Sequence, residues 1–228
     1  MPDPATIPGI IDEAIAEATA WGAKQLEVIL VRHGQPLAEE ERRTGEALDP
    51  PLAPLGRRQA AAASLALAGE EVDAVYSSDA TRAQDTARIV GERLGVPVRT
   101  LSDLREITVY RESGDATSDT PAWREAAAAF VAGGRWESFL QPIHDPAFRL
   151  RVRSAIGEIV AGRRTGTVAV VCHSGVINAH LADTLSLDRD YFIRPAHASI
   201  TRVRLSDGRW TLQSVNETAH LRPDLLTA

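Results

Sequence analysis

The chain has 228 residues, 44% of them hydrophobic, and a formal net charge of −6 from 25 basic and 31 acidic side chains. This length and composition allow a full hydrophobic core, and we expect one domain spanning residues 1–228. The acidic balance argues against a nucleic-acid partner, because proteins that bind nucleic acids present basic stripes to them. The sequence has no run of about 18 apolar residues that would span a membrane. A single cysteine, Cys172, excludes an internal disulfide and fits a cytoplasmic setting.

Residues 8–23 predict an amphipathic helix ahead of the first strand. Its apolar side carries Ile10, Ile11, Ala14, Ile15, Ala18 and Trp21, with three acidic residues opposite. This side would cover an edge of the sheet or join a second subunit; packing within the chain is favoured, and a homodimer is the alternative. Residues 1–24 are therefore interpreted as an N-terminal helical extension of the domain.

The stretch from Leu26 to Pro36 begins as a buried strand and ends in polar residues. Four consecutive apolar residues precede Arg32, His33 and Gly34. In an open α/β sheet, ligands bind at the carboxyl ends of the strands. Arg32 and His33 therefore predict an anion site that contains a nucleophile or base. Arg-His-Gly on its own is more often an exposed histidine after an edge strand, so further residues are needed to decide.

Helices and strands alternate through the middle of the chain, after a charged loop that ends near Pro54. Hydrophobic patterns and turn residues predict, in order, a helix over 55–68, a strand over 72–76, a helix over 80–94 and a short strand over 95–98.

Arg82 falls in the first turn of the helix predicted over 80–94, after capping oxygens from Ser77, Ser78 and Asp79. A cation is unfavourable there, because the helix dipole favours negative charge at the N-terminus. A bound anion would compensate Arg82. The alternative is an ion pair with Asp79 or Asp85.

Residues 107–145 differ in composition from the rest and read as a helical and loop insert over the site, with a helix predicted over 122–131. Its aromatic side chains would line a pocket or, as is favoured for most of them, pack on the sheet. They are Trp123, Phe130, Trp136, Phe139 and, as a further ring, His144.

The last third of the chain returns to regular structure and brings in a second histidine. The patterns predict a helix over 146–162, a strand over 167–172, a helix over 176–185, and hairpin strands over 199–205 and 210–215. The strand over 167–172 ends at His173, before a helix N-terminus. Together the elements predict a three-layer α/β/α fold with a mostly parallel central sheet, one antiparallel edge hairpin, and the insert over the C-terminal edge of the strands.

Five side chains from four segments are assigned to this one edge: Arg32, His33, Arg82, Glu106 and His173. Two guanidinium groups bind phosphate oxygens through paired donors, and a histidine can attack phosphorus. A carboxylic acid can protonate the departing oxygen. The set would transfer a phosphoryl group with no metal and no cofactor.

At these positions the sequence resembles the histidine phosphatase superfamily, branch 1, also called phosphoglycerate-mutase-like, from about Leu26 to Leu221. The motifs that carry the resemblance are Arg32-His33-Gly34, Pro51 to Ala60, Ser77 to Ala87, Leu104-Arg105-Glu106, Val171 to Ile177 and Val215 to Leu221.

The resemblance implies roles for the five residues. His33 would be the nucleophile that becomes phosphohistidine, and Glu106 the proton donor. Arg32, Arg82 and His173 would hold the phosphoryl oxygens. The expected activity is that of a metal-independent phosphatase acting on a small phosphomonoester, with selectivity from the insert over 107–145.

Three departures from the family pattern bear on the substrate. Pro36 and Glu39 stand where many relatives have a small hydroxyl residue and an asparagine, and no Gly-x-x-Glu-Gly run follows Glu106. One alternative is a phosphoglycerate mutase, but the Arg-His-Tyr-Gly that follows the mutase acid is absent. Another is a non-catalytic phosphate-binding or scaffold relative, which would have lost a core residue.

Four further residues receive weaker interpretations. His180 and His220 are read as structural, and Cys172 as a small buried core residue rather than a redox centre. His197, which precedes the last hairpin, stays undecided between the site and the scaffold.

Overall fold

The computed structural model describes residues 25–37, 49–107, 125, 128–130, 132–135 and 147–228. The helix predicted over 8–23 and most of the insert over 107–145 lie outside these residues. None of the described helices is long and apolar enough to cross a membrane.

The described residues form a six-stranded sheet in the order β3-β2-β4-β1-β5-β6. Its strands are β1 (Leu26–Arg32), β2 (Ala74–Ser77), β3 (Val98–Thr100), β4 (Gly166–Cys172), β5 (Ile200–Ser206) and β6 (Arg209–Glu217). The first four run parallel, and β5 and β6 form the antiparallel hairpin predicted at one edge.

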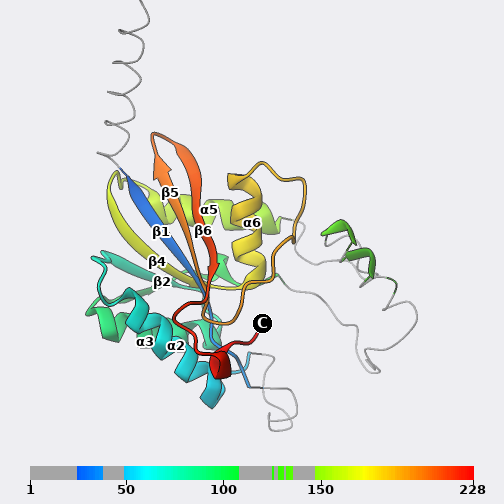
Figure 1. Ribbon diagram of the computed structural model, residues 1–228. Coiled ribbons are helices and arrows are strands. Elements are labelled where there is room, and N and C mark those ends of the chain that lie inside the picture. The colour runs from blue at the N-terminus through cyan, green and yellow to red at the C-terminus, as the bar shows by residue number, and fades with distance from the viewer. Residues whose placement is uncertain (1–24, 38–48, 108–124, 126–127, 131, 136–146) are drawn as a thin grey trace, which may run out of the picture.

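Helices cover both faces of the sheet (Figure 1). They are α2 (Pro54–Leu67) and α3 (Thr81–Leu94) on one face, and α5 (Phe148–Val160) and α6 (Ser174–Thr184) on the other. Each begins and ends within two residues of its predicted bounds. The predicted α/β fold, with a mostly parallel core and an antiparallel edge, is confirmed.

Strand β1 lies between β4 and β5 and is buried on both faces. Val28 and Leu30 belong to the core under α5 and α6, whereas Ile29 and Val31 belong to the core under α2 and α3. The strand therefore needs apolar residues at successive positions rather than at alternate ones, as is usual for a strand buried on both faces. The first polar side chains after this run emerge at the edge of the sheet.

The strand predicted over 95–98 is shifted toward the C-terminus. Gly95 ends α3 in the left-handed region, with φ of 69°, which a glycine adopts without steric cost. The chain becomes extended only after Pro97, and β3 shares only Val98 with the predicted strand. Strand β2 is shifted in the same direction, by two residues at its start and one at its end.

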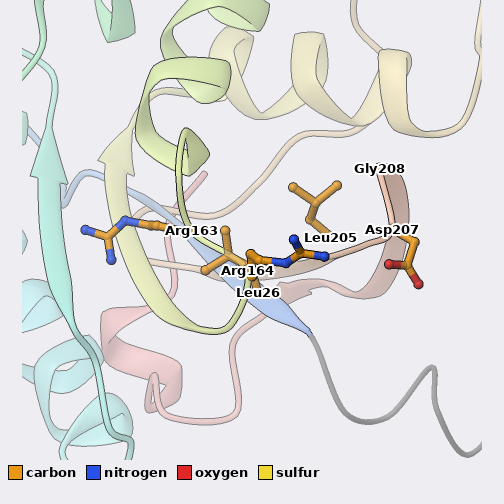
Figure 2. A pocket seen from close by; sticks show the side chains of 6 residues that line it. All are labelled: Leu26, Arg163, Arg164, Leu205, Asp207 and Gly208. Atoms are coloured by element: carbon orange, nitrogen blue, oxygen red, sulfur yellow. The ribbon is translucent and has the colours of Figure 1, made fainter.

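A small pocket lies at the opposite end of β1 from Arg32. Its lining residues are Leu26, Arg163, Arg164, Leu205, Asp207 and Gly208, from the start of β1, the loop before β4, the end of β5 and the hairpin turn. Figure 2 shows Arg163 and Arg164 pointing away from each other, so they do not converge on a common ligand. A seven-residue strand, about 20 Å long, separates this pocket from the edge that carries the predicted site.

Candidate active site

The pairing of β1 with β4 brings His33 and His173 together. The two strands are parallel neighbours in a register that places Arg32 beside Cys172, so both chains leave the sheet at the same level. The His33 amide also donates a hydrogen bond to the Cys172 carbonyl, at 3.0 Å. The two imidazole rings then meet edge to face, with 5.0 Å between their centroids.

Arg82 joins the two histidines from the first turn of α3. Its Nε donates to Nε2 of His33 at 3.2 Å, and its Nη2 lies 3.3 Å from Nδ1 of His173. The remaining nitrogen, Nη1, donates to the Asp49 carboxylate at 3.2 Å. One guanidinium group thus contacts both rings and an acid at the strand ends.

The alternative considered for Arg82, an ion pair with Asp79 or Asp85, is not what the structure shows. Those two acids bind other arginines, Asp79 to Arg105 and Asp85 to Arg57. The acid that meets Arg82 instead is Asp49, which follows the charged loop.

Asp49 also caps α3, a role that the sequence assigned to Ser77, Ser78 and Asp79. Both carboxylate oxygens of Asp49 accept the Thr81 amide, at 3.1 Å each. Of the three residues expected to cap the helix, Ser78 contributes, because its Oγ accepts the Ala80 amide at 3.2 Å. Negative charge at the helix N-terminus is favourable, so Asp49 stabilises both the helix and the arginine of its first turn.

His33 is held as a neutral imidazole with one nitrogen free to accept. Its Nδ1 donates to the carbonyl of Gly34 at 2.7 Å, so Nε2 carries the lone pair that faces Arg82. Burial, together with His173 and Arg82 nearby, holds the pKa of His33 well below its usual range. A neutral imidazole can attack an electrophile through Nε2 once Arg82 no longer donates to that nitrogen.

Gly34 carries the carbonyl that accepts the hydrogen bond from Nδ1 of His33, and close packing holds this glycine in place. A Cβ on Gly34 would collide with the backbone of Gly56, at the start of α2. The Gly34 amide donates to the Thr86 hydroxyl, at 3.1 Å. Only glycine allows this close approach of the two chain segments.

Arg32 lies on the other side of His33 and is held by the segment before β5. Its guanidinium donates to the carbonyl of Pro195 and, through Nη2, to Nε2 of His197 at 3.1 Å. The His197 ring centroid is 5.7 Å from that of His33. The structure therefore places His197 at the site. Burial, with Arg32 nearby, lowers its pKa to about 3, so the ring is neutral.

Glu106 lies at the N-terminus of α6, beside His173. Its Oε2 accepts the Gly175 amide and its Oε1 the Ile107 amide, each at 3.0 Å. Burial raises the pKa of Glu106, and the two amide donors oppose this shift. A Cβ at Gly175 would meet the Glu106 carboxylate, so a residue without a side chain is required there.

His173 is fully buried and carries a polar partner on each ring nitrogen. Burial, with Arg82 and Arg32 nearby, holds its pKa well below the usual range. Because the Arg82 guanidinium can only donate, Nδ1 of His173 accepts. Nε2, at 2.9 Å from the Ser78 hydroxyl, then carries the proton. Since that hydroxyl rotates, Ser78 can serve either tautomer of the ring.

The structure thus gathers Arg32, His33, Arg82, Glu106 and His173 at one edge of the sheet. Sequence reasoning missed Asp49 and Ser78 as partners of these side chains. The Asp49-Pro50-Pro51 run was the available signal for Asp49. Two prolines after an acidic residue restrict the backbone and so help to fix the position of its side chain.

The histidines read as structural lie in the scaffold. His180 packs edge-on against Trp210, with ring centroids 4.6 Å apart. His220 hydrogen-bonds the Ala198 carbonyl at 2.9 Å. Cys172 is a buried free cysteine, and burial raises the pKa of its thiol, which disfavours the reactive thiolate.

Among the described residues, no group of three or more His, Cys, Asp or Glu side chains is placed to hold a metal ion. The insert is represented by a few residues only. Of its aromatic candidates, Phe130 is described, and its ring lies 5.3 Å from that of Tyr191. The Tyr191 hydroxyl is 2.9 Å from that of Ser174, the first residue of α6.

Fold and site together define an α/β protein that holds two neutral histidines between two guanidinium groups at the carboxyl edge of a parallel sheet. The chain belongs to the histidine phosphatase superfamily, branch 1, whose family model matches residues 28–218.

Three relatives illustrate the range of names within this similarity. The probable phosphoglycerate mutase GpmB of Yersinia enterocolitica is 27% identical over 213 residues, which cover 86% of this chain and 95% of that protein. A solved structure titled mycobacterial hydrolase 1 has 30% identity and a TM-score of 0.71, over 86% of this chain and all of that one. A mycobacterial glucosyl-3-phosphoglycerate phosphatase has 28% identity and a TM-score of 0.68, over 84% and 99%. Relatives named as phosphatases and as mutases are both present.

Proposed function

We propose that this protein is a phosphatase that hydrolyses a small phosphomonoester through a phosphohistidine on His33, without a metal ion. The observation that carries the proposal is the state of the His33 ring, whose Nδ1 proton is held by Gly34 and whose Nε2 lone pair faces Arg82. The similarity to a solved structure that is named a phosphatase also supports hydrolysis.

In the first step, Nε2 of His33 attacks phosphorus and the bond from phosphorus to the leaving oxygen breaks. The leaving oxygen takes the proton of Glu106, whose raised pKa favours the acid form. Arg32 and Arg82 hold the other phosphoryl oxygens and stabilise their charge. His173 joins them when its proton stands on Nδ1, the tautomer in which the Ser78 hydroxyl donates to Nε2. Positive charge that develops on the His33 ring is stabilised by the Gly34 carbonyl at Nδ1.

In the second step, water attacks the phosphohistidine. The Glu106 carboxylate, left ionised by the first step, takes a proton from this water. The bond between phosphorus and nitrogen breaks, its electron pair returns to Nε2 of His33, and inorganic phosphate leaves. The enzyme is then back in its starting protonation state.

The leaving group would lie on the side of the site formed by α6. Glu106 binds the second amide of this helix, and Tyr191 contacts its first residue, Ser174. Tyr191 in turn neighbours Phe130 of the insert. These two aromatic rings on the α6 side are consistent with selection of the leaving group by the insert.

A second candidate function is a phosphoglycerate mutase, favoured by the names of curated relatives such as the probable phosphoglycerate mutase GpmB. A mutase would return the phosphoryl group from His33 to a substrate hydroxyl instead of giving it to water. Incubation with 3-phosphoglycerate, followed by phosphorus NMR, separates the two. Isomerisation without release of inorganic phosphate would replace our proposal with the mutase.

The proposal is tested with the purified full chain against a panel of phosphorylated metabolites and p-nitrophenyl phosphate, after dialysis against a chelator. We expect release of inorganic phosphate without added metal, and a trapped phosphoenzyme that is acid-labile and alkali-stable. His33→Ala should abolish both. Turnover that is lost on chelation and restored by one divalent ion, or that survives in His33→Ala, would overturn the proposal.

A further inference from the structure

We propose that Thr227, near the C-terminal end of the chain, is a positioning residue for oxyanion binding. It acts through His197, which it holds in the tautomer that accepts a hydrogen bond from Arg32. The proposal rests on the proposed function for its kinetic readout, because it takes Arg32 to be a ligand of the phosphoryl group.

Thr227 is joined to His197 by two hydrogen bonds. The amide of His197 donates to the Thr227 carbonyl at 2.8 Å, and Nδ1 of His197 lies 3.0 Å from the Thr227 hydroxyl. The other ring nitrogen, Nε2, faces Nη2 of Arg32 at 3.1 Å. A single imidazole thus connects the threonine to the arginine that precedes His33.

The proton on His197 can be assigned from its two partners. A guanidinium group has donors only, so Nε2 of His197 must accept from Arg32. The neutral ring then carries its proton on Nδ1, where the Thr227 hydroxyl is the acceptor. His197 as a residue is 9% exposed, so solvent has little access to replace a lost partner.

Without the Thr227 hydroxyl, each tautomer of His197 is unfavourable. If the proton stays on Nδ1, a largely buried donor has no acceptor, which is costly. If the proton moves to Nε2, two donors face each other across the contact with Arg32. In the first case His197 is no longer held at Nδ1, and in the second its hydrogen bond with Arg32 is lost. Either change weakens the orientation of the Arg32 guanidinium, which among the described residues is then held by the Pro195 carbonyl.

Thr227 is itself held in place by Gln59 of α2. The Gln59 amide nitrogen donates to the Thr227 hydroxyl at 2.8 Å and to the Leu225 carbonyl at 2.7 Å. Its amide oxygen accepts the Gln35 amide at 2.8 Å. Gln59 is fully buried, and Figure 1 shows the red C-terminal segment beside α2. The segment is therefore tied to the loop after His33 as well as to Arg32.

Thr227→Val tests the proposal, because valine keeps the shape and removes the hydroxyl. We expect the Kd for orthovanadate and for inorganic phosphate to rise roughly three- to tenfold, the range of one hydrogen bond. The KM for p-nitrophenyl phosphate should rise by a similar factor, with a smaller change in kcat. Thr227→Ser keeps the hydroxyl and should retain the parent affinity.

The matched control is Thr184→Val, at the end of α6. Thr184 is also partly buried, and its hydroxyl donates to the His180 carbonyl at 2.9 Å, away from Arg32. It should leave oxyanion affinity unchanged. Melting temperatures of all variants separate loss of fold from loss of orientation.

Two readouts separate positioning from general destabilisation. Long-range proton–nitrogen NMR should show Nδ1 of His197 protonated in the parent chain and a changed pattern in Thr227→Val. In a His197→Ala background, Thr227→Val should have no further effect on oxyanion affinity. Additive effects in this double variant, or unchanged affinity in Thr227→Val, would overturn the proposal.

Failure of the proposed function gives a different result. If the parent chain binds vanadate and phosphate but hydrolyses no phosphomonoester, the proposed activity is wrong while the binding and NMR comparisons still decide the role of Thr227. If the parent chain hydrolyses substrates and Thr227→Val equals it in every readout, the role of Thr227 is wrong and the activity stands.

Discussion

Arg82 donates a hydrogen bond from Nε to Nε2 of His33, the nitrogen that would attack phosphorus. The same guanidinium also faces His173. An incoming phosphoryl group offers Arg82 charged acceptors, which bind guanidinium more strongly than a neutral imidazole does. Binding of the oxyanion would therefore withdraw the donor from His33 and free its lone pair. In this arrangement the arginine couples recognition of the anion to exposure of the nucleophile.

The first prediction concerns the geometry of Arg82. Arg82→Lys keeps the charge but loses the planar fork that reaches both rings, so kcat/KM should fall roughly 10- to 100-fold. Steady-state kinetics and vanadate affinity measure this. Arg88→Lys is the matched control, because Arg88 lies on the exposed face of α3 and pairs with Glu92. Equal activity in Arg82→Lys would show that charge alone is sufficient.

The second prediction concerns Gly175. In Gly175→Ala the new Cβ would meet the Glu106 carboxylate, so the proton donor should be displaced and activity on alkyl phosphates reduced. Gly157→Ala in α5 is the control, because a Cβ there meets no other atom within 4 Å. That control should raise stability by about 0.5–1 kcal/mol, as alanine does in a helix interior. Full activity in Gly175→Ala would mean that Glu106 tolerates displacement.

The elements that build the site were predictable because their signals are local. The apolar runs before Arg32 and His173 show that each strand is buried. Arg32 is the last residue of its strand, and His173 follows its strand directly. The observed strand boundaries differ from the predicted ones where the conformation of a single residue sets the end of an element. Gly95, which ends α3, is the example. The order of the strands was not predicted, since pairing between distant segments leaves no local trace.

The sequence did not reveal, or left undecided, the site residues whose partners lie far away along the chain. Asp49 meets Arg82 across 33 positions, and His197 meets Arg32 across 165. Neither contact has a pattern of its own in the sequence. His197 stayed undecided because a histidine before a hairpin is equally suited to a scaffold. Its role depends on which arginine the fold brings to it.

The third prediction is that acid destabilises the fold. Four histidines have folded-state pKa values below the usual 6.5, with His180 at about 4 and His197 at about 3, mainly through burial. Below pH 6.5 the unfolded chain therefore binds more protons, so stability should fall as the pH falls. Each histidine contributes at most about 1.4 kcal/mol per pH unit. The raised pKa of Glu106 acts in the opposite direction, but it is one group against four.

Urea unfolding at pH 7, 6 and 5 measures this effect. We expect the midpoint to fall at each step while the slope of the transition stays constant. An unchanged midpoint between pH 7 and pH 5 would show that these rings are already accessible to protons in the native state.

The last prediction concerns Glu106 and the leaving group. An alkoxide is a strong base and needs a proton as it departs, whereas nitrophenolate departs largely unaided. Glu106→Gln keeps the size of the side chain and removes the proton. It should lower turnover of alkyl phosphates by about 10²- to 10⁴-fold and that of p-nitrophenyl phosphate much less.

The pH profile gives an independent check on the same residue. In the parent chain Glu106 must be protonated before attack, and burial raises its pKa, so activity on alkyl phosphates should decline as the pH rises through that value. His33 sets no limit near pH 6.5, because its pKa lies well below. In Glu106→Gln the alkaline decline should disappear. If the decline persists, or if both substrates lose activity equally when phosphoenzyme formation limits the rate, the proton comes from another residue, with Asp103 and the insert over 107–145 as the next candidates.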